Sequence, residues 1–540
     1  MAFNIADMIE YCVDAVPERE AVVDPRLRVT YAQLDERANR LAHHLAAQGV
    51  GAGQHVGIYA YNRVEFVETQ LAALKLRAVP ININYRYVPA ELRYIFENAD
   101  LVALVFERQF APLAAEAGAG VETLRHFVVL EDGSEESVDA LAALEYEKAL
   151  EASSPERGFE ARTDDDHYVI YTGGTTGMPK GVVWRHEDVF RTLGGGIDFY
   201  TREPVASDRE MAERAAAAEH PLIRFPIPPL MHGAAQWATF QGLFLGEPVV
   251  LIPRFDPADV WATVARERVN LLLVTGDAMA RPLADSLRDG GPDGPWDTSS
   301  LVSFSSSAAV FTQPVKDEII DLLGPNVILT DSIGSSETGF GGLTMVQRGQ
   351  PMKGGPTVSA GADTIVIDDD NRPIAAGAGV VGRIARGGNV PVGYYNDPVK
   401  TAETFIEIDG RRFAVPGDYG IVEDDGSITL LGRGSMCINS GGEKIYPEEV
   451  EGALKSHPAV FDALVVGVPD ERFGERVAAV VAPRSGAAPT LEELDAHCRQ
   501  HVAGYKVPRE LHLVAEVGRL PSGKPDYPWA KKVALGEIAG

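Results

Sequence analysis

The stretch 171–181, Tyr-Thr-Gly-Gly-Thr-Thr-Gly-Met-Pro-Lys-Gly, constrains the fold of this chain more than any other feature of its sequence. Its four glycines leave backbone N–H groups open to a ligand, its three threonines add hydroxyl donors, and Lys180 adds a positive charge. The apolar run 167–171 before it predicts a buried strand. The sequence therefore predicts a strand that leads into a flexible cradle for polyphosphate.

Two familiar phosphate motifs do not fit this loop. A Walker loop ends in Gly-Lys-Ser/Thr, whereas here Pro179 precedes Lys180 and Gly181 follows it. The order of the glycines also differs from the G-x-G-x-x-G fingerprint of dinucleotide-binding proteins. The loop therefore indicates a phosphate site of a third kind.

The first part of the chain alternates between two kinds of secondary structure. Apolar runs at 56–61, 79–83 and 101–106 predict strands, and the segments 65–76 and 91–98 between them predict helices. Alternating strands and helices form a parallel sheet with helices on its faces. We therefore expect an α/β fold.

The rest of the chain adds two further parts. Segment 354–425 is rich in Val, Ile, Gly and Asp and predicts a β-rich subdomain. Predicted strands at 463–468 and 477–482, followed by a helix at 491–502, indicate a small α+β unit. The 540 residues are too many for one hydrophobic core, so two or more domains are expected.

Composition excludes several classes of function. The net charge of −29 argues against binding to nucleic acid or to anionic membrane surfaces. No apolar run approaches the roughly 18 residues of a membrane span, and the first residues lack a signal-peptide pattern. The three cysteines, Cys12, Cys437 and Cys498, are far apart and odd in number, which argues against disulfides and a zinc site. We expect a cytoplasmic protein.

A second motif lies at 331–342, Asp-Ser-Ile-Gly-Ser-Ser-Glu-Thr-Gly-Phe-Gly-Gly, after a predicted strand at 327–330. Its one glutamate is Glu337. A polyphosphate brings several negative charges, and a hard cation such as Mg²⁺ binds carboxylate and phosphate oxygens together. Glu337 is therefore the candidate metal ligand.

These two motifs resemble those of the adenylate-forming enzymes, a superfamily of acyl-CoA synthetases, luciferases and peptide-synthetase adenylation domains. The tract 431–451 is similar to the hinge of that family, and Lys524 follows glycine as its catalytic lysine does. The likeness covers essentially the whole chain and is greatest to actinobacterial acyl-CoA synthetases of steroid side-chain degradation. It implies a large N-terminal domain, 1–432, built of parallel-type α/β subdomains and a β-rich subdomain. A small mobile α+β domain, 433–540, would follow.

The resemblance implies a set of residues around the nucleotide. Lys524, Glu337, Thr172 and Lys180 would be catalytic. The residues expected to bind ATP are Thr172, Gly173, Gly174, Thr175, Thr176, Gly177, Lys180, Ser307, Ala308, Ala309, Asp331, Ser332, Ile333, Ser336, Asp418, Arg433 and Lys524. Gly441 and Gly442 would line the tunnel for the pantetheine arm of CoA.

Four residues are expected to line the pocket for the acid. The resemblance indicates His232 near the reacting carboxylate, with Trp237, Phe340 and Gly341 around it. Apolar rings beside small residues predict a broad site that suits a bulky hydrophobic acid better than acetate.

We therefore expect an ATP-dependent, AMP-forming acyl-CoA synthetase that uses Mg²⁺ and CoA and acts on a steroid side-chain acid or a long-chain fatty acid. A homodimer is compatible with the sequence. Medium-chain and aryl acids, and an adenylate-forming ligase with a different acyl acceptor, stay open as alternatives. A nucleotide-binding sensor without catalysis is a further alternative, but a mere binder has no need of Lys524.

Overall fold

The computed structural model describes residues 3–172, 178–193, 195–196, 203–292, 294–309, 311–349, 357–361, 363–433, 436–440, 443–470, 474–502, 504–520 and 524–538. Its backbone divides into two compact units. Unit 1 comprises Met1–Val274, Ser286–Ser305 and Asn389–Glu403, and unit 2 comprises Thr275–Asp285, Ser306–Gly388 and Thr404–Gly540. The domain boundary expected after residue 432 stays a prediction.

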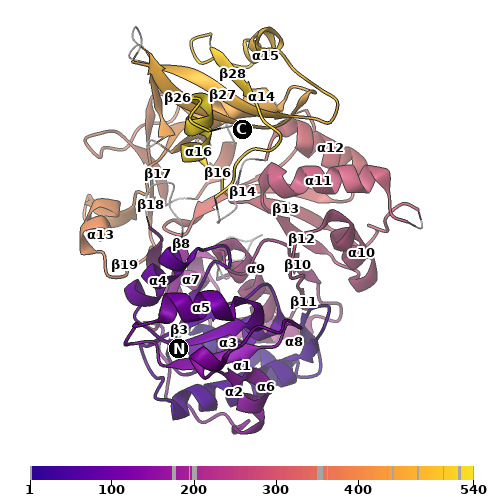
Figure 1. Cartoon of the computed structure of the whole chain (residues 1–540), viewed down its shortest axis with the longest axis vertical. Helices are drawn as coiled ribbons and strands as arrows, with labels where there is room; N and C mark the ends of the chain where they lie inside the picture. The colour runs from indigo at the N-terminus through magenta and orange to yellow at the C-terminus, as the bar shows by residue number, and fades with distance from the viewer. Residues whose placement is uncertain are drawn as a thin grey trace. The chain divides into compact units, whose positions relative to one another are not determined.

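A five-stranded parallel sheet forms one part of unit 1. Its strands, in spatial order, are β4 (Val79–Asn82), β3 (His55–Tyr59), β5 (Leu101–Glu107), β6 (His126–Leu130) and β7 (Leu144–Glu145). The helices of this part are α2 (Tyr31–Ala47), α3 (Val64–Lys75), α4 (Pro89–Asn98), α5 (Ala111–Gly118) and α6 (Tyr146–Glu151). Helices α2, α3 and α6 lie together (Figure 1), with α3 against β3 and α6 against β6 and β7. The expected alternation of strands and helices is confirmed.

Helix α2 shows how the sequence sets these elements. The Thr30 hydroxyl accepts a hydrogen bond from the Gln33 amide at 3.2 Å, and the Gln33 side chain accepts one from the Thr30 amide at 2.9 Å. This reciprocal capping box satisfies two backbone donors at the helix start. One face of the helix, spaced by three and four residues, is fully buried and consists of Tyr31, Leu34, Ala38, Leu41 and Leu45.

Unit 1 contains two further groups of strands. The first runs in the order β2 (Arg28–Thr30), β1 (Glu20–Val23), β11 (Val249–Val250), β10 (Arg224–Pro226) and β12 (Leu271–Val274). The second is an antiparallel sheet of β19 (Gly393–Tyr394), β9 (Lys180–Arg185) and β8 (His167–Thr172). The accompanying helices are α1 (Ile5–Ala15), α7 (His186–Thr192), α8 (Glu210–Ala217), α9 (Gly233–Phe244) and α10 (Pro257–Glu267).

Unit 2 begins with a run of mostly antiparallel strands. The order is β14 (Ile328–Ser335), β15 (Gly339–Met345), β16 (Thr357–Ala360), β23 (Ile428–Arg433), β22 (Asp418–Val422), β18 (Val381–Gly387), β21 (Arg411–Ala414) and β20 (Phe405–Ile408). Strand β17 (Thr364–Ile367) pairs with β18, and β13 (Ser303–Ser307) lies beside β14. Helix α12 (Gln313–Leu323) and most of α11 (Gly276–Asp289) belong to unit 2, whereas α13 (Pro398–Thr404) belongs to unit 1 except for its last residue. The expected β-rich subdomain is confirmed.

The last part of unit 2 is a five-stranded sheet with helices on both faces. Its strands are β25 (Glu443–Ile445), β24 (Ile438–Ser440), β27 (Gly474–Pro483), β26 (Val460–Asp470) and β28 (Glu510–Leu513). Along β26, Ala463 and Val465 face α14 (Pro447–Lys455) and α15 (Leu491–Cys498), whereas Leu464 and Val466 face α16 (Tyr527–Ala534). Because neighbouring residues of a strand point to opposite faces, a continuous apolar run fills both layers.

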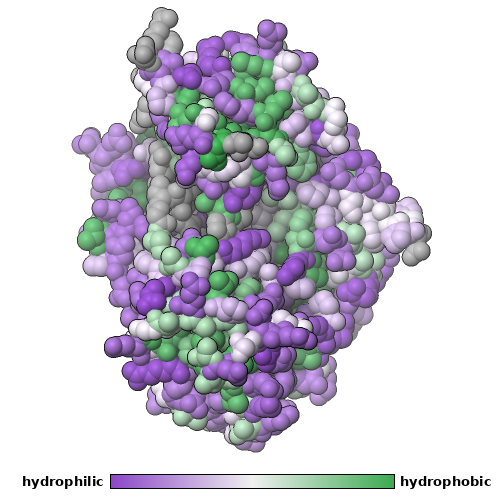
Figure 2. Space-filling view, in the orientation of Figure 1, coloured by the Kyte–Doolittle hydropathy of each residue, from purple (hydrophilic) through white to green (hydrophobic). Residues whose placement is uncertain are grey.

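The visible surface is mostly hydrophilic (Figure 2). None of the helices in the described ranges has the length and apolar content needed to cross a membrane.

Candidate functional site

The predicted phosphate loop connects β8 and β9 of unit 1. Thr172 and Lys180 are paired across the two strands, directly at the start and end of the loop. Both are half-buried, and the Lys180 ammonium lies 5.4 Å from the centroid of the Tyr394 ring. A Cβ at Gly181 would lie 2.8 Å from the Tyr171 ring, so this position requires glycine. Residues 173–177, which carry the expected glycine and threonine donors, lie outside the described residues.

His232 and Trp237 lie at the start of α9, also in unit 1. His232 is the residue before the helix, and its amide donates to the Pro229 carbonyl at 2.9 Å. A Cβ at Gly233 would lie 2.9 Å from the Trp237 ring, so glycine lets that ring fold back over the helix start. These two expected pocket residues thus both lie at the start of α9, and both are half-buried.

Glu337 lies at the tip of the β14–β15 hairpin in unit 2. The Ser335 hydroxyl accepts hydrogen bonds from the amides of Glu337 at 3.3 Å and Thr338 at 3.1 Å. The Ser335 amide in turn donates to the Thr338 hydroxyl at 3.2 Å. A Cβ at Gly334 would overlap the carbonyl oxygen of Gly339 across the hairpin. The turn is therefore fixed by hydrogen bonds among residues 335–338 and by a glycine.

Several expected nucleotide residues lie along the same hairpin and the end of β13. Ser332 donates from its hydroxyl to the Ser306 carbonyl at 3.1 Å, which connects the two strands. Ala308 has a φ of +67°, in the left-handed region that favours glycine. The other expected residues in this part are Ser307, Ala309, Ile333, Ser336, Phe340 and Gly341, none of them fully buried. Unit 2 therefore brings the adenine, phosphate and metal candidates of two motifs onto neighbouring strands.

Asp331 differs from these residues, because it is buried. Its carboxylate lies 2.7 Å from the ammonium of Lys316 on α12. Burial raises the pKa of Asp331, and the charge of Lys316 offsets only part of that effect. A direct role of Asp331 in ATP binding stays a prediction, while the structure shows an internal ion pair that supports β14.

Asp418 and Arg433 occupy neighbouring strands of unit 2. Asp418 is the first residue of β22, Arg433 is the last of β23, and the two residues are directly paired. The Gly432 backbone has a φ of +111°, and a Cβ there would overlap the Glu448 carboxylate of α14. The register therefore brings two expected nucleotide residues to one point of the sheet.

Lys524 lies three residues before α16. Its carbonyl accepts a hydrogen bond from the Leu520 amide at 2.8 Å, and Arg519 and Pro525 form a backbone bridge. The Asp526 carboxylate caps α16 by accepting from the Trp529 amide at 2.9 Å. Lys524 is half-buried. Gly441 and Gly442, expected near CoA, lie outside the described residues.

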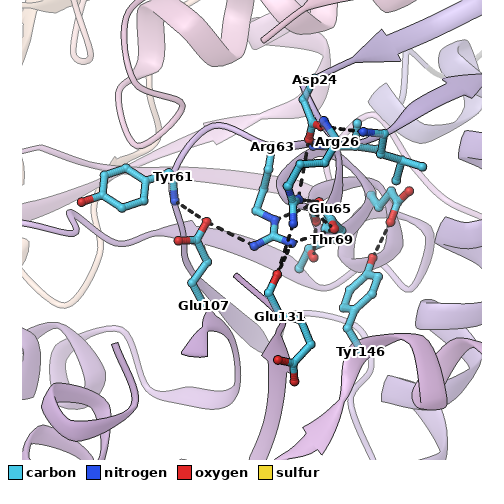
Figure 3. A network of polar contacts seen from close by, with 12 residues as sticks. Asp24, Arg26, Tyr61, Arg63, Glu65, Thr69, Glu107, Glu131 and Tyr146 are labelled. Atoms are coloured by element: carbon cyan, nitrogen blue, oxygen red, sulfur yellow. Dashed lines mark hydrogen bonds and ion pairs between the residues drawn. The ribbon is translucent and has the colours of Figure 1, made fainter. Parts of the chain in front are cut away.

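Sequence reasoning missed a buried network of charged side chains in unit 1. In Figure 3, Arg63 donates to both carboxylate oxygens of Glu65, at 2.7 and 2.8 Å. The same guanidinium lies 3.3 Å from the Glu107 carboxylate at the end of β5. These contacts fix the turn between β3 and α3, and Asn62 stands in that turn. The sequence signal was a charged pair two residues apart, which is usually a surface feature.

Comparison with known proteins assigns the class of this chain. The AMP-binding enzyme family matches residues 9–395, and the AMP-binding enzyme C-terminal domain family matches residues 449–524. The chain belongs to the AMP-binding enzyme family, and the resemblance to the adenylate-forming superfamily is confirmed.

Two relatives and one solved structure match this chain over nearly its whole length. The chain is 56% identical over 534 residues to a 3-oxocholest-4-en-26-oate–CoA ligase of Rhodococcus rhodochrous, covering 98% of this chain and 96% of the relative. It is 54% identical to a medium/long-chain-fatty-acid–CoA/3-oxocholest-4-en-26-oate–CoA ligase of Mycolicibacterium smegmatis, with coverage of 99% and 97%. The crystal structure of ATP-bound MatB from Rhodopseudomonas palustris has a TM-score of 0.80 at 23% identity, with 99% of both chains covered. The expected fold class is confirmed.

Proposed function

We propose that this protein is an ATP-dependent, AMP-forming acyl-CoA synthetase for a bulky hydrophobic carboxylic acid, either a steroid side-chain acid or a long-chain fatty acid. The observation that carries the proposal is the full-length identity of 56% to a ligase named for a steroid acid. The apolar rings of Trp237 and Phe340 support the same class of acid. Phe340 is 38% exposed, so its ring is available to a ligand.

The proposed reaction has two steps. A carboxylate oxygen of the acid attacks the α-phosphorus of ATP, the bond from that phosphorus to the bridging oxygen breaks, and pyrophosphate leaves. The thiol of CoA then attacks the acyl carbon, its proton is released, and AMP leaves. Because the first step joins two anions, catalysis consists mainly of alignment and charge neutralisation.

We assign roles in that first step to four residues. Lys180 and the Thr172 hydroxyl bind the phosphates that leave, and Lys524 stabilises the charge that develops at the reacting centre. Asp418 accepts hydrogen bonds from the ribose hydroxyls. These roles rest on the resemblance and on residue chemistry.

Glu337 is proposed as the protein ligand of Mg²⁺. No group of three or more His, Cys, Asp or Glu side chains that could hold a metal occurs within the described ranges. A single carboxylate at a hairpin tip fits Mg²⁺, which keeps several waters and binds phosphates rather than a complete protein cage. When bound, the ion would neutralise phosphate charge. We further propose a cytoplasmic location, and a homodimer stays a prediction.

The test is the release of AMP with a panel of acids, with and without CoA. We expect CoA-dependent release and one thioester per AMP, with higher kcat/KM for a 3-oxo steroid acid or palmitate than for acetate. A higher kcat/KM for acetate would refute the substrate class. Acyl-AMP that accumulates regardless of CoA would indicate a different acyl acceptor.

A further inference from the structure

Asn82 is a buried asparagine at the end of β4, with 5% of its surface exposed. Its side-chain oxygen accepts a hydrogen bond from the Tyr171 amide at 2.8 Å, and its side-chain nitrogen donates to the Tyr171 carbonyl at 2.9 Å. The side chain thus pairs with Tyr171 as a neighbouring strand would. Tyr171 directly precedes Thr172, where the phosphate loop begins.

The same side chain also contacts the segment that leads to His232. The Asn82 nitrogen donates its second hydrogen to the Met231 carbonyl at 2.6 Å, and Met231 directly precedes His232. All three hydrogen-bonding groups of one buried amide are therefore used, two on the strand before the phosphate loop and one on residues 228–232. We call residues 228–232 the acid loop.

Two other amides support the acid loop. The Asn62 oxygen accepts from the Leu230 amide at 2.6 Å, and its nitrogen donates to the Pro228 carbonyl at 3.2 Å. Gln236 donates to the Leu230 carbonyl at 2.7 Å and accepts from the Tyr168 hydroxyl on β8. Asn62 therefore connects the acid loop to the β3–α3 turn only, whereas Asn82 and Gln236 also reach β8.

We propose that Asn82 is a positioning residue that aligns the phosphate loop with the acid loop, so that the α-phosphate and the carboxylate meet in reacting geometry. This inference rests on the proposed function. The amide is required because a carboxylate could accept from Tyr171 but could not donate to the two carbonyls. A displacement of about 1 Å between reacting groups can cost about 10²-fold in rate. Hydrogen bonds in a buried site resist such displacement better than exposed ones.

The test compares Asn82→Asp and Asn82→Ala with two control variants. Asn62→Ala removes support from the acid loop without touching β8. Asn39→Ala removes a buried asparagine on α2 that bonds Asp35 and the Pro155 carbonyl, at 3.2 and 2.9 Å, and serves as the control for stability. For each variant, kcat and both KM values of acyl-AMP formation are measured, together with the thermal midpoint.

We expect both Asn82 variants to lower kcat by roughly 10- to 100-fold and to raise the KM for ATP and for the acid together. Asn62→Ala should raise the KM for the acid while the KM for ATP stays within about twofold, because both hydrogen bonds of the Asn62 side chain go to the acid loop. Asn39→Ala should lower the thermal midpoint with kinetics unchanged. If Asn82→Asp keeps the wild-type kcat, or reproduces the pattern of Asn62→Ala, Asn82 is only structural and the proposal fails.

Two further measurements separate this inference from the proposed function. ATP affinity by calorimetry needs no knowledge of the acid, and it should weaken in Asn82→Asp but not in Asn62→Ala. Thioester formation from supplied acyl-AMP should stay near wild type in Asn82→Asp if the variant is folded. Failure of the wild-type protein to release AMP with any acid would refute the proposed function, while equal ATP affinity in all variants would refute the role of Asn82.

Discussion

Asp418 and Arg433 lie directly opposite each other, at the first residue of β22 and the last residue of β23. The antiparallel register determines which residues meet at this point of the sheet. A carboxylate that accepts both ribose hydroxyls needs a rigid backbone, because hydrogen-bond strength falls steeply with misalignment. The strand pair supplies that rigidity.

Asp418→Asn should therefore weaken ATP binding. A hydrogen bond to a charged group contributes about 1.5–3 kcal/mol, so the KM for ATP should rise roughly 10- to 100-fold. The KM for the acid should change little. Asp425→Asn, in the turn at the other end of the same two strands, is the matched control. An unchanged KM for ATP would show that Asp418 does not bind the nucleotide.

Lys524→Ala should separate the two steps of the reaction. Loss of one positive charge at the reacting centre should slow acyl-AMP formation by about 10²–10³-fold. Thioester formation from supplied acyl-AMP should be spared, because that step does not join two anions. Single-turnover assays measure both steps, and Lys532→Ala on the exposed face of α16 is the control. Equal loss of both steps would contradict this assignment.

Gly334→Ala should disturb the turn that presents Glu337. The new Cβ would overlap the Gly339 carbonyl oxygen, so the hairpin must shift. We expect acyl-AMP formation to fall by about 10²-fold and half-maximal activity to need more Mg²⁺. In Gly361→Ala the Cβ would have its nearest neighbour, the Arg386 guanidinium, at 3.7 Å, and activity should not change. A Mg²⁺ titration identical to wild type would contradict the proposed metal role of Glu337.

The buried network of Figure 3 predicts a pH dependence of stability. Burial would raise the pKa of Glu65, but hydrogen bonds and charges from Arg63 and Arg26 outweigh it and lower the pKa to about 2. The stabilisation of the fold by ionised Glu65 is therefore present above about pH 4.5, the pKa of this group in the unfolded chain, and it is lost as the pH falls toward 2. Glu65→Gln breaks a buried ion pair and should cost about 3–5 kcal/mol at pH 7.

The loss of unfolding free energy caused by Glu65→Gln should shrink below pH 4.5, by about 1.4 kcal/mol per pH unit. The measurement is the urea midpoint of wild type and variant from pH 7 to pH 3.5. Glu36→Gln removes an exposed carboxylate 2.9 Å from Arg40 and should cost less than about 1 kcal/mol. A difference between wild type and Glu65→Gln that does not vary with pH would show that Glu65 does not carry this linkage.

Local patterns predicted much of the fold. The buried strand before the phosphate loop and the capped helix after Thr30 depend on near neighbours in sequence, and both occur as expected. Strand β4 ends at Asn82 rather than at residue 83, and the Asn82 side chain there forms two hydrogen bonds with the Tyr171 backbone. Boundaries of this kind depend on tertiary contacts and cannot be derived from periodicity.

The supports of the site could not be predicted for the same reason. The hydrogen-bond partners of Asn82 lie 89 and 149 residues away in the chain, and an asparagine at the end of a strand resembles any turn residue. Asp331 stands in a motif that indicates ATP, yet its partner Lys316 comes from a separate helix. The sequence identifies such residue types, but only the fold determines which of them meet.

The pairing of Gly393 with Val183 has a consequence for synthesis of the chain. Gly393 follows Val183 by 210 residues, so these 210 residues must be synthesised before β19 can pair with the edge of β9. At about 5–20 residues per second, that interval lasts roughly 10–40 s on the ribosome. An uncovered strand edge is a template for pairing with other chains. The hairpin that carries the phosphate loop is thus exposed to such pairing in a nascent chain, and slower translation between these residues would lengthen that exposure.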